Sequence, residues 1–101
     1  MLYITKPEQV RSAASKLAGM THIGVDTETT GLDPHTNKVL LLQLGNKDYQ
    51  FVVDVHKVEN DLQPILDILT NKDIVKILHN AKFDYQFIRS NFGIKMRNVG
   101  C

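Results

Sequence analysis

Three apolar segments joined by short, turn-rich links lie in the middle of the chain and restrict its fold more than any other feature. They span residues 22–27, 38–44 and 49–55. Apolar runs of this length, bounded by Gly, Pro, Asn and Asp, are typical of β-strands. Because parallel neighbours need a longer crossover connection than these links provide, successive strands are expected to run antiparallel. The segment therefore predicts a three-stranded antiparallel meander.

Helical patterns precede and follow this meander, because apolar residues there recur at the spacing of one helix face. Counted from their N-cap residues, the predicted helices are residues 5–18, 61–69 and 80–92, and the predicted further strands are residues 2–4 and 74–78. Gly93 is expected to end the last helix. A meander followed by helix, strand and helix predicts a mixed α/β fold in which helices flank one sheet.

Composition limits the size and the compartment. The 101 residues suffice for one small domain, and 43% hydrophobic with 23% charged residues is ordinary for a globular protein. The net charge of +1 neither supports nor excludes a nucleic-acid partner. The single cysteine, Cys101, allows no internal disulfide and no cysteine-based zinc site. Residues 1–8 meet charge and proline too soon for a secretory or membrane segment, so we expect a cytoplasmic protein without a membrane partner.

Acidic and amide side chains follow two of the predicted strands. Asp26 and Glu28 end the first strand of the meander and, two residues apart, project to the same face. Asp84 follows the strand at residues 74–78, and Asn80, four residues earlier, lies on the same helix face. If these two strands pair in parallel, all three carboxylates meet at one edge of the sheet. Such a group predicts a site for a pair of Mg²⁺ or Mn²⁺ ions, and with it phosphodiester hydrolysis.

The same residues also carry a family resemblance. Val-Asp-Thr-Glu-Thr-Thr-Gly-Leu-Asp-Pro, at residues 25–34, and His-Asn-Ala-Lys-Phe-Asp, at residues 79–84, resemble motifs I and II of the DEDD 3′–5′ exonucleases. The sequence between the two motifs is similar to that of the proofreading domain of family A DNA polymerases, the DNA polymerase I-like group that includes phage members. The resemblance implies a ribonuclease H-like mixed sheet with flanking helices.

The resemblance also implies roles for single residues. By motif position, Asp26 bridges two divalent metal ions, Glu28 binds the ion that activates water, and Asp84 serves the second ion. Four further positions match those that hold the terminal nucleotide: Thr29, Leu32, Asn80 and Phe83. The implied partner is the 3′ end of single-stranded DNA, with RNA as a possible substitute, and the implied reaction is proofreading-type 3′–5′ hydrolysis.

One motif of the family is absent. The third motif, Tyr-x-x-x-Asp or His-x-x-x-x-Asp on a later helix, has no counterpart, because no acidic residue follows Asp84. Residues 1–101 are therefore expected to form part of an exonuclease domain, truncated before the last strand and helices, with little activity of its own. A complementing C-terminal fragment or a polymerase domain would complete it.

Three alternatives stay open at this point. The first is a catalytically inactive module that binds nucleic-acid ends or a polymerase. The second is RNA 3′ trimming of the ribonuclease D type. The third is a gene remnant that folds poorly. The basic residues Lys72, Lys76, Lys82 and Arg89 do not form a run, so a solvated position is expected for each.

Overall fold

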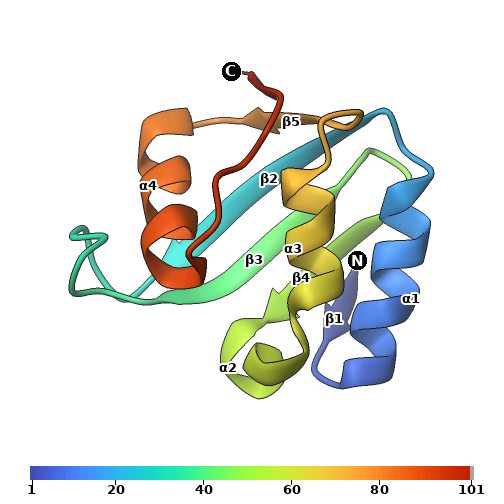
Figure 1. Ribbon diagram of the computed structural model, residues 1–101. Coiled ribbons are helices and arrows are strands. Elements are labelled where there is room, and N and C mark those ends of the chain that lie inside the picture. The colour runs from blue at the N-terminus through green and yellow to red at the C-terminus, as the bar shows by residue number, and fades with distance from the viewer. Residues whose placement is uncertain (101) are drawn as a thin grey trace.

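The computed structural model describes residues 1–100, which form a single six-stranded sheet with helices packed on it (Figure 1). The strand order across the sheet is β1-β4-β3-β2-β5-β6. The strands are β1 (Leu2–Ile4), β2 (His22–Thr29), β3 (Val39–Gly45), β4 (Gln50–Asp54), β5 (Val75–Leu78) and β6 (Val99–Gly100). The helices are α1 (Pro7–Ala18), α2 (Val55–Val58), the short 3₁₀ helix η1 (Glu59–Asp61), α3 (Gln63–Thr70) and α4 (Ala81–Phe92).

The predicted meander is present, since β2 pairs antiparallel with β3 and β3 pairs antiparallel with β4. The parallel pairing that the candidate site requires, β2 with β5, is present as well. The segment at residues 2–4 is a strand, and its partner is β4. Strand β6, which the sequence pattern does not indicate, pairs in parallel with β5 at the sheet edge. The mixed α/β fold is therefore confirmed.

All three long helices cover the same face of the sheet (Figure 1). Helix α1 links the parallel strands β1 and β2, α3 links β4 to β5, and α4 links β5 to β6. Each connection moves across the sheet in the same direction in the observed strand order. Because such crossovers are right-handed, connections that advance the same way place their helices on one face. None of the helices within residues 1–100 is long and apolar enough to cross a membrane.

The ends of the helices agree with local chemistry. Gly93 ends α4 in the left-handed conformation, with φ of 69°, as predicted. The helix expected from Asp61 begins two residues later, at Gln63, because residues 59–61 form the separate 3₁₀ turn η1. Pro64 falls in the first turn of α3, where its missing N–H removes no helical hydrogen bond.

The two faces of the sheet differ in burial. Along β2, Ile23 and Val25 are buried beneath the helices, whereas Gly24, Asp26 and Glu28 are exposed. We call this second face, which carries none of the helices within residues 1–100, the open face. Its neighbouring strands add apolar side chains to it, and Ile77, opposite Gly24, is 42% exposed.

Lys76 of β5 contradicts the expectation of a solvated position. It pairs with Ile23 on the helix-covered side and is completely buried. Its ammonium donates to the backbone carbonyl of Asn71, after α3, and to that of Arg97 at 2.9 Å, while its backbone N–H donates to the carbonyl of Asn98. Lys76 thus ties the segment before β6 to the sheet. Residue spacing alone misplaced Lys76, because β5 has only four residues and the segment that covers the lysine has no regular pattern.

Candidate functional site

The candidate site lies where β2 extends past the end of β5. The last register pair of these two strands joins Val25 to Leu78, and the chain then turns into α4. Residues 26–28 of β2 therefore lie beyond the end of β5 and border the first turn of α4. Loops beyond the carboxyl ends of parallel strands are where open α/β sheets commonly bind ligands.

Thr27 contacts a carboxylate from β2, that of Asp26, and one from α4, that of Asp84. Its hydroxyl donates to Oδ1 of Asp84 at 2.6 Å, across 57 residues of sequence. Its backbone N–H donates to Oδ1 of Asp26 at 2.9 Å. One threonine thus holds a carboxylate from each cluster, and the two clusters lie side by side in the fold.

Asp84 is buried, with 2% of its surface exposed. Its Oδ1 accepts the Thr27 hydroxyl, but its Oδ2 is also buried and has no hydrogen-bond partner within residues 1–100. Burial raises the pKa of the Asp84 carboxyl, the hydrogen bond from Thr27 opposes that change, and the nearby charge of Asp26 adds to it. A buried carboxylate oxygen without a donor is unfavourable unless a cation or another donor reaches it.

Asp26 and Glu28 occupy the open face at the end of β2, and both are exposed. In the pairing with β3, Asp26 lies opposite Gln43 and Glu28 opposite Leu41, and the register then shifts between Glu28 and Thr29. The extra residue at this shift is Leu40 of β3, so the irregularity lies on the strand that faces the end of β2. Irregularities of this kind are common beside functional sites.

The carboxylates do not form a preassembled cage. Within residues 1–100, no group of three or more His, Cys, Asp or Glu side chains is close enough to hold a metal ion. Asp26 and Glu28 reach over the open face, whereas Asp84 approaches from α4 on the side of Thr27. The unpartnered Oδ2 of Asp84 and the all-oxygen donor set nevertheless suit a hard divalent cation.

The four residues expected to contact substrate differ in their environments. Asn80 is the N-cap of α4, but its side chain makes no capping hydrogen bond, so its amide is free of that structural role. Phe83 is half-buried and packs on Phe87 with ring centroids 4.7 Å apart. The Thr29 hydroxyl donates to the carbonyl of Gly31 at 2.7 Å. Leu32 is 85% exposed, which excludes the core position that a leucine usually takes.

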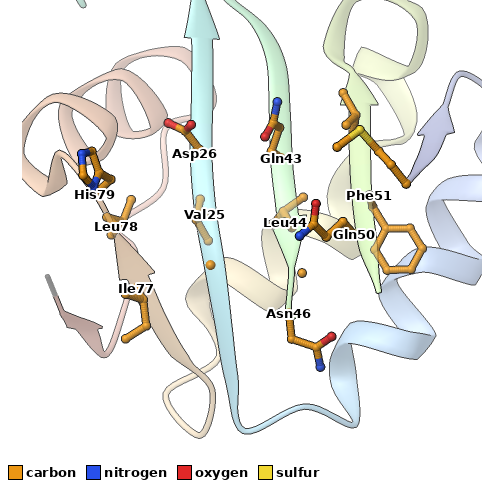
Figure 2. Close-up of a pocket in the computed structure, with 14 residues that line it drawn as sticks. Val25, Asp26, Gln43, Leu44, Asn46, Gln50, Phe51, Ile77, Leu78 and His79 are labelled. Carbon is orange, nitrogen blue, oxygen red and sulfur yellow. The ribbon is translucent and has the colours of Figure 1, made fainter. Parts of the chain in front are cut away.

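A cavity of about 560 Å³ lies against the open face beside this site. Figure 2 shows Asp26, Gln43 and His79 toward one end of the cavity and Asn46 toward the other. Gly24 and Val52 are among the residues that line it. Asp26 therefore borders both the α4 contact and the cavity.

Sequence reasoning missed Thr27 as a member of the site. The strand alternation correctly placed its side chain on the face opposite Asp26 and Glu28. A β-branched residue in a strand needs no functional explanation, because its propensity for strands is explanation enough. The helix that brings Asp84 to its hydroxyl is visible only in three dimensions.

Comparison with known proteins places this geometry in context. A family model described as 3′–5′ exonuclease matches residues 1–101. Ribonuclease D from Bartonella henselae is 30% identical over 88 residues, which cover 87% of this chain and 22% of that protein. The DNA polymerase of Mycobacterium phage D29 is 34% identical over 83 residues, covering 76% of this chain and 13% of that protein.

The fold has solved counterparts as well. The catalytic core of RRP6 from Trypanosoma brucei superimposes with a TM-score of 0.87 at 23% identity, covering 97% of this chain and 27% of that one. The chain thus spans about a quarter or less of each of these three proteins.

Proposed function

The chain belongs to the 3′–5′ exonuclease family, and on this premise we propose that its site takes part in metal-dependent hydrolysis of the terminal phosphodiester at a nucleic-acid 3′ end. The contact between Thr27 and Asp84 carries the proposal, because it sets a buried carboxylate with one unpartnered oxygen beside Asp26. Fold maintenance gives no reason to bury that oxygen without a donor.

In this proposal Asp26, Glu28 and Asp84 hold a pair of Mg²⁺ or Mn²⁺ ions. Divalent ions at such a site would activate the attacking water and stabilise the leaving oxygen. Asp26 lies on the same face of β2 as Glu28, and its charge acts on Asp84, so it is suited to bridge the two ions. Asp84 would contribute its free Oδ2 while Thr27 keeps Oδ1 in place.

Four neighbouring side chains would position the terminal nucleotide. Leu32, unpacked at 85% exposure, would wedge against the last base, and Phe83 would contact its sugar or base. The Asn80 amide, which makes no capping bond, would donate a hydrogen bond near the terminal phosphate. Thr29 would line the same place from the end of β2.

A further segment would complete the active centre. We propose that residues 1–101 supply part of an exonuclease domain, and that a segment carrying Tyr-x-x-x-Asp or its histidine counterpart adds the missing ligand and the group that orients water. The open face and its cavity beside Asp26 offer room for such a segment. The small share of each relative that the chain spans is consistent with this division.

Two substrate classes have support from relatives. Similarity to a phage DNA polymerase favours the proofreading of DNA, which is the first candidate. Similarity to ribonuclease D favours the trimming of RNA 3′ ends, which is the second. A binding comparison between 12-nucleotide DNA and RNA of the same sequence, each with a free 3′-hydroxyl, distinguishes the two.

A chimera tests the proposed reaction in a complete domain. This chain would replace the matched 88 residues of the Bartonella henselae ribonuclease D, and release of mononucleotides from 3′-labelled DNA and RNA would be measured in Mg²⁺. We expect hydrolysis by the chimera, and a loss of at least about 100-fold when Asp26 becomes Asn, because transition-state charge loses its stabilisation. The chain alone is expected to cleave little. A folded chimera that degrades neither substrate would refute the proposal.

Thr27 is expected to control metal affinity through Asp84. Thr27→Val keeps the shape of the side chain but removes the hydroxyl that fixes Oδ1 of Asp84. Loss of a partner that orients a metal ligand typically weakens binding by about 10- to 100-fold. We expect at least a tenfold weaker Kd for Mn²⁺ by calorimetry, with most of the affinity restored in Thr27→Ser. Equal Kd values for the valine and serine variants would show that the hydroxyl plays no part.

A further inference from the structure

We propose that the outer face of α4 is a second nucleic-acid surface, which holds the single strand behind the 3′ end. The inference rests on the proposed function, because it assigns the partner of the same site beyond the terminal nucleotide. The surface is a groove of about 450 Å³ between α4 and β6, which we call the α4 groove. Its lining residues are Ala81, Lys82, Tyr85, Gln86, Arg89 and Val99.

Helical spacing explains why these residues share one surface. Lys82, Gln86 and Arg89 follow one another at intervals of four and three residues, which places their side chains along one helix face. The opposite face of α4 carries Phe87 and Ile88, both completely buried against the core. Lys82, Gln86 and Arg89 therefore lie on the side of α4 that packing leaves free, whereas Ala81, Tyr85 and Val99 are partly buried against the core.

Charge is segregated toward this part of the chain. Residues 81–100 carry four basic side chains, Lys82, Arg89, Lys95 and Arg97, and all four are exposed. Their single acidic residue, Asp84, is buried on the other side of α4. The near-zero net charge of the whole chain conceals this local excess. A locally positive surface attracts a polyanion and does so in a salt-dependent way.

The chemistry of the groove favours a single strand over other anions. Its floor is largely apolar, formed by Ala81, Val99 and the ring of half-buried Tyr85, while Lys82 and Arg89 supply the charges. An aromatic ring with cations beside it is the combination that binds single-stranded nucleic acid without sequence preference, by stacking and phosphate attraction. An acidic protein segment would use the same charges but would gain less from the ring.

The position of the groove links it to the site. Lys82 belongs to the same first turn of α4 as Asp84. Arg89 lies seven residues later, about 10 Å further along the helix axis at 1.5 Å per residue. Because Asp84 lies on the other side of the helix, a strand whose 3′ end occupies the carboxylates would pass around the first turn of α4 at Lys82 and then run to Arg89. The groove extends the proposed active site along α4 without sharing its metal ligands.

Oligonucleotides of two lengths test this inference. We would measure binding of fluorescein-labelled dT₃, which reaches only the site, and dT₁₂, which also reaches the groove, by anisotropy in Mn²⁺ and in EDTA. We expect dT₁₂ to bind more tightly than dT₃. Arg89→Ala should weaken dT₁₂ about fivefold at low salt, lower the salt slope by about 0.7 and leave dT₃ unchanged. Tyr85→Leu, which keeps an apolar side chain, should also weaken dT₁₂ selectively.

Arg11→Ala is the matched control, because it removes the same charge from an exposed position on α1. If Arg11→Ala weakens dT₁₂ binding as much as Arg89→Ala does, the groove is not the binding surface, and dT₁₂ is held only by general attraction to positive charge. If dT₃ binds in a Mn²⁺-dependent way while dT₁₂ binds no better, the groove fails and the proposed function stands. If neither oligonucleotide binds and the chimera is inactive, the proposed function fails. Preference for a poly-glutamate peptide over dT₁₂ would also overturn the assignment.

Discussion

Replacement of Asp84 by asparagine is expected to raise the melting temperature of the metal-free chain and to abolish its stabilisation by Mn²⁺. Because burial raises the pKa of this carboxyl in the folded state, the folded chain loses stability as pH rises through the region where Asp84 ionises. That penalty is complete once the pH exceeds the raised pKa of the Asp84 carboxyl. The amide carries no charge and still accepts the Thr27 hydroxyl through its own Oδ1.

The two effects of Asp84→Asn have opposite signs. Without metal, relief of a buried, half-satisfied carboxylate should add about 1–2 kcal/mol to the free energy of unfolding. With Mn²⁺ at 100 times its Kd, the wild-type chain should gain about 3 kcal/mol and the variant almost nothing. Thermal unfolding by circular dichroism, with and without Mn²⁺, measures both.

Asp48→Asn is the control for this experiment, since Asp48 is exposed in the turn between β3 and β4. It should change neither the metal-free melting temperature nor the response to Mn²⁺. A folded Asp84→Asn variant that keeps the full Mn²⁺ response would remove Asp84 from the metal site and with it the basis of the proposed mechanism.

Lys76 is expected to make the chain more stable in alkaline solution. Burial, and then the charge of Arg97, lowers the pKa of this ammonium from 10.5 to about 8. Between those values the unfolded chain binds the proton and the folded chain does not, so the free energy of unfolding rises with pH. The two states differ by at most one bound proton, so the free energy of unfolding rises by at most about 1.4 kcal/mol per pH unit. Urea unfolding at pH 7.5 and pH 10 measures it.

Lys76→Met isolates this contribution, because the thioether fills similar space without a charge. The variant should lose the pH dependence between 8 and 10.5 that the wild type shows. Lys57→Met, at an exposed position on α2, should keep it. A wild-type profile as flat as that of Lys76→Met would mean that Lys76 has an ordinary pKa despite its burial.

Local patterns in the sequence predicted much of this fold. The meander at residues 22–55, the parallel strand at 75–78 and the end of α4 at Gly93 all follow from spacing and turn chemistry. These elements are predictable because burial selects side chains at a period of two or of about 3.6 residues. Strand β6, two residues long, is too short to show any period.

The sequence by itself determined which carboxylates follow a strand. Asp26 and Glu28 lie on one face at the end of β2, and Asp84 lies at the start of α4, which follows β5. The sequence also determined family membership, since both motifs are local strings. Only the tertiary structure decided that Thr27 holds Asp84, that Lys76 lies inside the core, and that Lys82 and Arg89 share a groove with Val99. The reason is physical: these relations join residues that are distant in sequence, and a hydrogen bond, the burial of a charge or a common surface depends on how elements pack rather than on the residues within one element.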